Sequence, residues 1–301
     1  MYFAVMDLGT NSVRLLIAKK NSSNVYLPCH SRVEITRLGE DTARDRRLKQ
    51  EAVERTLEVM KSYLLDIKEY RAEITAVLGT SAVRESRNKE CLISRLKNEV
   101  DIDLKVLSGK EEADLSYLGV VKSLREIENP LVFDLGGGST ELVWYQGGYL
   151  YLESLKLGVV RLTEACIFTD PPALQDVNAV QQYVRKTLTP LKSRLKGKFK
   201  ELVGAGGTIT SLAAVKQGLE IYDSRRVHGF VLSREEVRDL LTCLSSLKEE
   251  DRKKIPGLQP QRADVIAAGT AIVLTLMEEL DFHRVTVSEG DLLLGALYKF
   301  N

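Results

Sequence analysis

Short apolar runs and longer stretches with helical spacing alternate along the 301-residue chain. Apolar runs of strand length lie at 3–6 and 13–18, and a second pair of such runs lies at 131–133 and 142–145. Only a few residues, mostly glycine, serine, threonine and asparagine, separate the two runs of each pair, and such residues are typical of tight turns. The pattern therefore predicts a β-hairpin at both places.

Helical spacing follows each predicted hairpin. Apolar residues recur three or four positions apart over 50–65 and again over 177–197, which predicts two amphipathic helices. Ser108 is expected to cap a helix that carries Glu111 and Glu112. Further strands are predicted near 25–27, 74–78, 104–107, 149–155, 202–203 and 285–287, and further helices at about 88–98, 209–217, 234–248, 263–279 and 291–299.

The same order of elements thus occurs twice, with strands first and crossover helices after them. This order favours an α/β fold in two halves. A polar stretch that ends in Pro130 precedes the second hairpin and indicates a boundary there. We therefore expect domains at 1–127 and 128–301, with a last helix that is able to pack back on the first domain.

The turns of the two hairpins share one motif. Asp-Leu-Gly-x-x-Ser stands at 7–12 and again at 134–139. Because glycine has no Cβ, consecutive backbone N–H groups of such a turn can approach a single anion. Two such turns, each with a carboxylate at its mouth, indicate a protein that handles phosphate groups and a metal ion.

Charge and cysteine content exclude several other classes of protein. A formal net charge of +1 argues against bulk electrostatic capture of nucleic acid or a membrane surface. The four cysteines are scattered without a C-x-x-C pair, so neither a disulfide framework nor a structural zinc site is expected. No apolar run approaches the roughly 18–20 residues of a membrane helix, and we expect no leader peptide, because a predicted strand begins at the N-terminus. We expect a cytoplasmic protein.

Eight segments, in the same order, resemble those of the exopolyphosphatase / guanosine pentaphosphate phosphohydrolase family. They are 7–14, 37–40, 79–84, 108–113, 134–141, 158–164, 204–208 and 262–266. The resemblance is to the short form, without the C-terminal helical domains of longer members. It implies two actin-like (ribonuclease H-like) α/β domains with the active site in a cleft between them. It also implies Mg²⁺-dependent release of terminal phosphate from inorganic polyphosphate, guanosine pentaphosphate or both.

Glu112 is the expected general base. A water that attacks phosphorus must lose a proton, and a carboxylate can take it. The resemblance gives this role to the second glutamate of Ser-Gly-x-Glu-Glu, which is Glu112 here. By themselves, Glu111 and Glu112 would also fit as first-turn acids that the helix dipole favours, and Glu111 is interpreted in that way.

Asp134 and Glu141 are the metal ligands that the resemblance implies. Mg²⁺ prefers oxygen ligands and keeps several waters, so one or two carboxylates and a substrate phosphate suffice. Asp7 holds the equivalent place in the first hairpin and is a third candidate ligand. Mn²⁺ is the alternative ion. The competing interpretation is that Asp134 only accepts hydrogen bonds from turn amides.

The predicted phosphate-binding residues come from the glycine turns and from arginines near the motifs. They are Thr10, Asn11, Ser12, Arg14, Thr80, Ser81, Arg84, Gly136, Gly137, Gly138, Ser139, Gly206, Gly207, Thr208 and Arg262. The basic stretch at 186–200 is interpreted as a solvated helix face in preference to a track for polyphosphate.

Two departures from the family pattern keep other functions open. Leu293 stands where the family often has an arginine, and Gln261 replaces a frequent glutamate. A non-catalytic sensor of polyphosphate or guanosine tetraphosphate therefore remains an alternative, as does an actin-like ATP-dependent kinase. The expected partner is polyphosphate or a guanosine penta- or tetraphosphate, with no nucleic acid or membrane, and a homodimer is considered.

Overall fold

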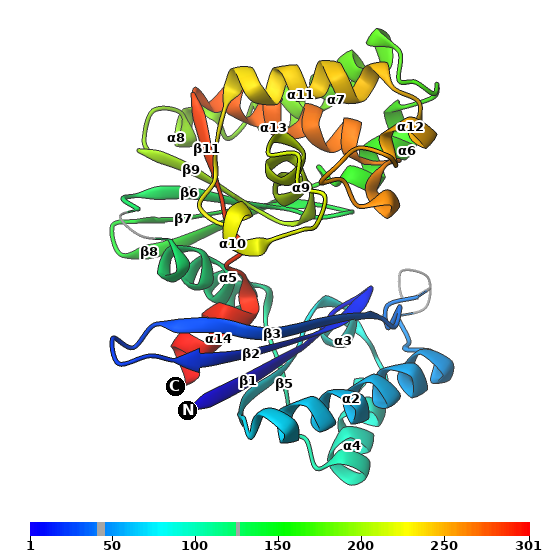
Figure 1. Cartoon of the computed structure of the whole chain (residues 1–301), viewed down its shortest axis with the longest axis vertical. Helices are drawn as coiled ribbons and strands as arrows, with labels where there is room; N and C mark the ends of the chain where they lie inside the picture. The colour runs from blue at the N-terminus through cyan, green and yellow to red at the C-terminus, as the bar shows by residue number, and fades with distance from the viewer. Residues whose placement is uncertain (41–45, 125–126) are drawn as a thin grey trace. The chain divides into compact units, whose positions relative to one another are not determined.

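A computed structural model describes residues 1–40, 46–124 and 127–301. The chain divides into two compact units (Figure 1): unit 1 contains residues 1–122 and 291–301, and unit 2 contains residues 123–290. The division that the sequence suggests, at 127/128, lies a few residues further along the chain. Within the described ranges, every helix is too short or too polar to cross a membrane.

Unit 1 is built around a five-stranded sheet of order β3-β2-β1-β4-β5. Its strands are β1 (Tyr2–Leu8), β2 (Ser12–Lys20), β3 (Tyr26–Ile35), β4 (Glu73–Gly79) and β5 (Leu104–Val106). Its helices are α2 (Gln50–Tyr70), α3 (Ser81–Glu85), α4 (Lys89–Val100), α5 (Gly109–Ser123) and α14 (Leu292–Phe300).

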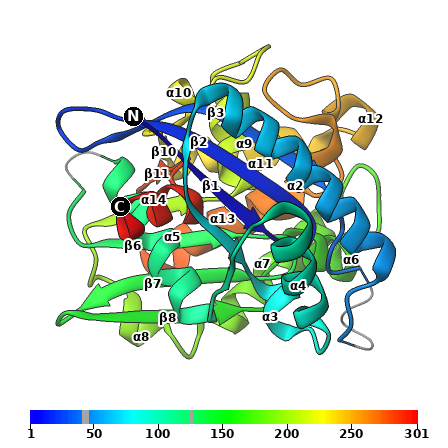
Figure 2. The ribbon, with the colours of Figure 1, turned by 90° about the horizontal axis from the view of Figure 1, so that it is seen from below.

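The central strand β1 is buried on both faces, which explains its continuous apolar run. Ala4, Met6 and Leu8 belong to a core cluster with residues of α2 and α4. Phe3 and Val5 belong to a second cluster with residues of α5 and α14. Successive side chains of a strand point to opposite faces, so α2 and α4 cover one face of the sheet (Figure 2), and α5 and α14 cover the other.

Two glycines bring α5 and α14 into backbone contact. A Cβ on Gly295 would lie 1.8 Å from the carbonyl oxygen of Leu115, and one on Gly119 would lie 1.9 Å from that of Asp291. Only glycine allows so close an approach. Leu293 is 5% exposed and belongs to the same core cluster. Where the family often has an arginine, this chain therefore has a packed apolar side chain.

Unit 2 contains a six-stranded sheet of order β10-β11-β9-β6-β7-β8. Its strands are β6 (Pro130–Leu135), β7 (Thr140–Gln146), β8 (Tyr149–Leu155), β9 (Glu201–Ala205), β10 (Val231–Ser233) and β11 (Arg284–Val287). Its helices are α6 (Val159–Cys166), α7 (Leu174–Leu188), α8 (Lys192–Leu195), α9 (Gly207–Lys216), α10 (Ser224–Val227), α11 (Arg234–Ser246), α12 (Glu249–Arg252), the 3₁₀ helix η1 (Pro260–Arg262) and α13 (Ile266–Leu280). Helix α13 is apolar on nearly all sides and lies among α6, α7, α9 and α11.

The second sheet repeats the first. The order β8-β7-β6-β9-β11 in unit 2 matches β3-β2-β1-β4-β5 in unit 1. In both, the first three strands are antiparallel and the last two run parallel to the central strand. The predicted α/β fold in two halves is therefore confirmed, and the repeat extends from one motif to the whole sheet. Strand β10 is an addition at the edge of unit 2.

Several predicted elements differ in length from those observed. The strand expected near 25–27 is the first part of the ten-residue edge strand β3, whose later residues mix polar and apolar side chains and are mostly exposed. The helix expected over 177–197 ends at Leu188 and resumes as α8, because Pro190 has no N–H with which to continue the helical ladder. Strand β10 and the helices α3, α6, α10, α12 and η1 were not predicted, and all of them are short.

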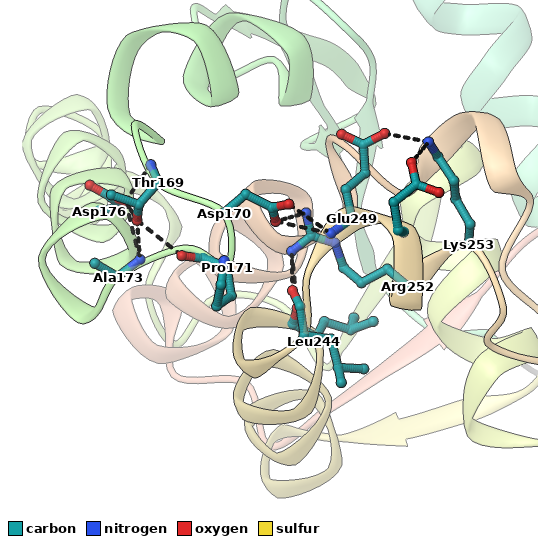
Figure 3. Close-up of polar contacts among 11 residues, drawn as sticks. Thr169, Asp170, Pro171, Ala173, Asp176, Leu244, Glu249, Arg252 and Lys253 are labelled. Carbon is teal, nitrogen blue, oxygen red and sulfur yellow. Dashed lines mark hydrogen bonds and ion pairs between the residues drawn. The ribbon is translucent and has the colours of Figure 1, made fainter.

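A buried arginine joins three segments of unit 2 (Figure 3). Arg252 is 3% exposed, and its Nη1 donates to the carbonyl oxygens of Leu244 and Leu247 at 3.2 and 3.0 Å. Its Nη2 lies 3.5 Å from Asp170, which also accepts from the Glu249 N–H at 2.9 Å. Arg252 thus binds the last carbonyls of α11, where a cation is favourable, and ties them to α12 and to the loop before α7.

Candidate active site

The glycine turn of unit 1 is held from its carbonyl side by a second segment. The Gly9 N–H donates to the Ser12 carbonyl at 3.0 Å and closes the hairpin. The carbonyl oxygens of Thr10 and Asn11 accept from the N–H groups of Gly39 and Arg37, each at 2.8 Å. The segment at 37–40, one of the family-like segments, therefore determines how the turn is oriented.

The turn of unit 2 is held in the same way, by the start of α6. The Gly136 N–H donates to the Ser139 carbonyl at 3.0 Å, as in unit 1. The carbonyl oxygens of Gly136 and Gly137 accept from the N–H groups of Val159 and Val160, each at 3.0 Å.

Gly158 allows this contact between α6 and the turn. A Cβ on Gly158 would lie 2.2 Å from the carbonyl oxygen of Gly137, so any other residue would push α6 away from the turn.

This arrangement leaves the N–H groups of the second turn for a ligand. Within the described residues, the N–H groups of Gly137 and Gly138 make no hydrogen bond to the protein. In a trans peptide group the C=O and N–H point in opposite directions. Because α6 binds the carbonyls on one side, the N–H groups face the other side, where consecutive amides can bind an anion.

The two hairpins differ in charge at equivalent positions. Asp7 pairs with Arg14 across β1 and β2, and Asp134 pairs with Glu141 across β6 and β7. Directly opposite residues share a face, with Cβ atoms about 4.5–5.5 Å apart. Unit 1 therefore has a carboxylate beside a guanidinium at this position, and unit 2 has two carboxylates.

In unit 1, Arg14 lies between two carboxylates. Its Nε and Nη2 donate to Asp7 Oδ2 at 3.0 and 2.8 Å, and its Nη1 donates to Asp291 Oδ2 at 2.6 Å. Asp7 is 4% exposed, and burial raises the pKa of its carboxyl, although Arg14 opposes the shift. Within the described part of the chain, Asp7 Oδ1 is buried without a hydrogen-bond partner. Arg14 thus orients a buried carboxylate that has one oxygen left for another ligand.

Asp291 is a residue that the motifs did not single out. Its Oδ1 accepts from the N–H groups of Leu293 and Leu294 at 3.0 and 3.3 Å, so it is the N-cap of α14. The available signal was an aspartate directly before an apolar helix. Its contact with Arg14 joins residues 277 positions apart, which no local pattern predicts.

In unit 2, Asp134 and Glu141 form a pair of carboxylates beside the turn. Glu141 Oε1 accepts from Ser139 Oγ at 2.7 Å and from Ser154 Oγ at 2.8 Å. A Cβ on Gly206 would lie 2.8 Å from Asp134 Oδ1, and Gly206 has a φ of +95°, so this position favours glycine for two reasons.

The donor set of this pair fits Mg²⁺. Asp134 and Glu141 offer oxygen ligands on one face of the hairpin, and this ion needs few protein ligands because it keeps several waters. Within the described residues, no group of three or more acidic, histidine or cysteine side chains is arranged so that it could hold a metal ion. These two carboxylates are therefore the candidate metal ligands of unit 2.

The third predicted phosphate turn begins helix α9. Gly206 precedes this helix, and its first N–H groups have no partner within the helix. The guanidinium of Arg262 lies against Gly207, where a Cβ would come within 2.1 Å of Cζ. Burial lowers the pKa of Arg262, and its Nε donates to Gln259 at 3.1 Å. The side chain of Thr208 is buried against Gly269, so a contact from Thr208 to a ligand would come from its backbone.

Glu112 and Glu111 have different surroundings, although they are adjacent. Glu112 Oε2 accepts from Arg84 Nη1 at 2.7 Å, and Arg84 also donates to the carbonyl of Leu107 at 3.0 Å. Glu111 Oε2 accepts from both the N–H and the hydroxyl of Ser108, which lowers the pKa of Glu111. Glu111 therefore belongs to a capping box at the start of α5, whereas Glu112 is held by an arginine from α3.

Thr80 and Ser81, the remaining predicted residues of unit 1, lie at the start of α3, the helix that carries Arg84. Thr80 is 6% exposed, and its hydroxyl donates to the carbonyl of Leu8 at 3.3 Å. Ser81 starts α3 and donates to Glu85 at 2.9 Å. Asp7, Thr10–Ser12, Arg14, Thr80, Ser81, Arg84 and Glu112 thus belong to unit 1, and Asp134, Gly136–Ser139, Glu141, Gly206–Thr208 and Arg262 belong to unit 2.

Most of the basic side chains at 186–200 form ion pairs with acidic side chains. Its ion pairs join Lys192 to Glu279, Arg194 to Glu153, Lys196 to Asp281 and Lys200 to Glu128. Such pairs suit the solvated helix face that the sequence suggested.

The duplicated sheet, with a glycine turn after the first strand of each unit, defines an α/β protein of the actin-like fold. The sequence profile of the Ppx/GppA phosphatase family matches residues 16–300, and the chain therefore belongs to this family. The resemblance drawn from the eight segments is confirmed.

Individual relatives support the same assignment. Exopolyphosphatase 2 of Mycobacterium tuberculosis is 35% identical over 97% of this chain and 96% of that protein. A bifunctional 3-dehydroquinate synthase/phosphatase of Fusobacterium nucleatum is 36% identical over 98% of this chain, which spans 46% of that longer protein.

Solved structures of relatives agree over the full length. A Ppx/GppA phosphatase of Aquifex aeolicus, type II variant, superposes with a TM-score of 0.90 at 33% identity and covers 100% of this chain and 99% of that one. An exopolyphosphatase from Cytophaga hutchinsonii has a TM-score of 0.81 at 27% identity, over 99% and 97% of the two chains.

The two roles of Asp291 can be separated by substitution. Asp291→Ala should lower the free energy of unfolding by about 1 kcal/mol, because the cap of α14 is lost. Asp291→Asn keeps the cap and removes only the ion pair. The side chains of Arg14 and Asp291 are 31% and 32% exposed, so this pair should contribute less than about 1 kcal/mol. Urea denaturation measures the free energy of unfolding of both variants. Ser233→Ala, which removes the N-cap of α11, serves as the reference for the loss of a cap. Equal losses for Asp291→Ala and Asp291→Asn would contradict the capping role.

Proposed function

We propose that this protein hydrolyses terminal phosphoanhydride bonds and releases phosphate from inorganic polyphosphate, with guanosine pentaphosphate as a poorer substrate. The observation that carries the proposal is the pair of carboxylates, Asp134 and Glu141, beside a turn whose N–H groups are left for an anion. A cation and a phosphate group both have suitable partners there. Membership of the Ppx/GppA phosphatase family supports the same reaction class.

In the proposed reaction, Glu112 is the general base. It takes a proton from water as the water oxygen bonds to the terminal phosphorus and the anhydride P–O bond breaks. The hydrogen bond from Arg84 at 2.7 Å holds the carboxylate in one orientation. Glu111 takes no part, because both of its interactions with Ser108 cap α5.

Asp134 and Glu141 would hold the magnesium ion. When bound, the ion supplies positive charge to the phosphate oxygens. The hydroxyls of Ser139 and Ser154 orient Glu141 for this role. Asp7, with one buried oxygen that has no hydrogen-bond partner among the described residues, is suited to accept from a water or to contact a cation.

Backbone amides supply most of the remaining stabilisation of the phosphates. The candidate donors are the N–H groups of both glycine turns and of the start of α9. Such donors are fixed before the substrate binds, so they stabilise developing charge without reorganisation. Arg14 and Arg84 are held by carboxylates, and in this arrangement Arg262 is the more available guanidinium among the predicted phosphate ligands.

Polyphosphate is preferred because the candidate groups recognise phosphate and not a base. Turn amides and guanidinium groups bind phosphate oxygens, whereas guanine recognition requires a hydrogen-bonding pocket for the base edge. The relative from Mycobacterium tuberculosis carries the name exopolyphosphatase 2.

Parallel assays of phosphate release test the proposal. Long polyphosphate, guanosine pentaphosphate and ATP are supplied with Mg²⁺, and each assay is repeated with excess EDTA. We expect the highest kcat/KM on polyphosphate and no release in EDTA. A tenfold advantage for guanosine pentaphosphate, about 1.4 kcal/mol in transition-state binding, would overturn the substrate choice alone. If none of the three substrates released phosphate, the hydrolase proposal would be overturned.

Substitution of the general base should separate chemistry from binding. In Glu112→Gln we expect kcat to fall by about 10²–10⁴-fold, because the amide cannot accept the proton, while substrate affinity by calorimetry is retained. The adjacent Glu111→Gln is the matched control and should stay active. A Glu112→Gln variant with more than about a tenth of the wild-type rate would refute the assignment.

Removal of one metal ligand should weaken magnesium binding. Asp134→Asn should raise the Mg²⁺ concentration needed for half-maximal activity and lower Mg²⁺ affinity in calorimetry, because one ligand charge is lost while the turn persists. Glu153→Gln is the control. Glu153 precedes Ser154 on β8 and therefore points to the opposite face of the sheet. An unchanged Mg²⁺ dependence in Asp134→Asn would exclude Asp134 as a ligand.

A further inference from the structure

The side chain of Arg161 completes the contacts that hold the glycine turn of unit 2. Arg161 is the third residue of α6 and is exposed. Its backbone N–H donates to the carbonyl of Gly137 at 3.2 Å, and its side-chain Nε donates to the carbonyl of Gly138 at 3.0 Å. Three consecutive carbonyls of the turn, those of Gly136, Gly137 and Gly138, therefore all accept hydrogen bonds from the start of α6.

The third carbonyl receives its hydrogen bond from this side chain. The first N–H groups of α6 bind the carbonyls of Gly136 and Gly137, and Gly138 receives its hydrogen bond from Arg161 Nε. In unit 1 the carbonyls of Thr10 and Asn11 accept from backbone N–H groups, and no side chain within the described residues donates to them. Arg161 is thus a feature of the second turn.

The carbonyl of Gly138 and the N–H of Ser139 belong to one planar trans peptide group. Fixing the oxygen on one side therefore fixes the direction of the N–H on the other. The positive charge of the guanidinium also polarises the peptide group, which strengthens its N–H as a donor.

Arg161 differs in its charge environment from Arg14 and Arg84 of unit 1. Arg14 is bound to Asp7 and Asp291, and Arg84 is bound to Glu112. Throughout 1–40, 46–124 and 127–301, Arg161 forms no ion pair with a carboxylate, and its one side-chain hydrogen bond goes to the turn. Its charge is therefore not compensated locally and acts on the turn.

We infer that Arg161 is a positioning residue of the phosphate-binding turn: its side chain fixes the Gly138–Ser139 peptide group so that the Ser139 N–H faces the bound phosphate. The inference rests on the proposed function, since it assumes that this turn binds phosphate. It adds a residue whose effect is exerted through another residue's backbone, without contact between Arg161 and the substrate.

Binding of imidodiphosphate, whose P–N–P bridge resists hydrolysis, tests the inference in the presence of Mg²⁺. Arg161→Ala should weaken binding about tenfold, as expected for the loss of one hydrogen bond from a charged group. Arg161→Lys should recover most of the affinity, because its ammonium can donate to the same carbonyl. Arg284→Ala is the matched control: Arg284 is also exposed and without an ion pair in the described chain, and it begins β11 at the opposite end of the parallel strands.

Amide NMR gives the readout that a general loss of stability would not produce. In the wild type, imidodiphosphate should shift the amide signals of Gly137, Gly138 and Ser139. In Arg161→Ala the response of Ser139 should be lost, while that of Gly137, whose peptide group is held by Val159, should persist.

Three outcomes would overturn the inference. They are affinity of Arg161→Ala within twofold of the wild type, an unchanged Ser139 response in that variant, and a wild type that does not bind imidodiphosphate. A wild type that binds imidodiphosphate but hydrolyses none of the three substrates would refute the proposed function and leave the role of Arg161 to be decided by the same binding data.

Discussion

The orientation of a few peptide groups in two glycine turns is the constraint on which the candidate site depends. In each unit, a second segment of chain binds the carbonyl oxygens of the turn, with distances of 2.8 to 3.2 Å. Since the C=O and N–H of a trans peptide point in opposite directions, these contacts leave the N–H groups on the ligand side. Contact at this range leaves no room for a side chain at Gly158. Two of the family-like segments, 37–40 and 158–164, therefore orient the turns through hydrogen bonds, a role that requires no contact with substrate.

Duplication of the sheet has produced two hairpins with the same backbone and opposite charge patterns. At the position across from the first aspartate, unit 1 has Arg14 and unit 2 has Glu141. The carboxylate of Asp7 is therefore paired with a cation within its own hairpin, and this ion pair opposes the rise in pKa that burial causes. In the second hairpin two carboxylates share a face, an arrangement that is stabilised by a cation. The two hairpins thus share a backbone arrangement but differ in electrostatic environment, because Arg14 in one corresponds to Glu141 in the other.

Much of the positive charge in the described chain is paired with acids. Arg14 and Arg84 of the candidate site are bound by carboxylates, and elsewhere Lys192 and Arg194 of α8 pair with Glu279 and Glu153. The net charge of +1 for the whole chain agrees with this picture. In the proposed function, attraction for a polyanion therefore comes from oriented amides and a few guanidinium groups. This is the arrangement in which positioning contributes more to phosphoryl transfer than a strong general field.

Local patterns in the sequence determined the hairpins, most of the helices, the α/β class and the glycine motif, because hydrophobic periodicity and turn composition are properties of neighbouring residues. The family-like segments also singled out Glu112, Asp134 and Glu141 as candidates, whose roles remain predictions. Tertiary structure decided what those patterns do not encode. The edge strand β3 extends to Ile35 through mostly exposed residues because it pairs with β2, and Leu293 lies in the apolar core of unit 1. Asp291 meets Arg14 across 277 positions, and Arg161 meets Gly138 across 23. Such contacts join polar groups that are far apart in the sequence, so they leave no periodic signal and exist only once the sheets and helices have packed.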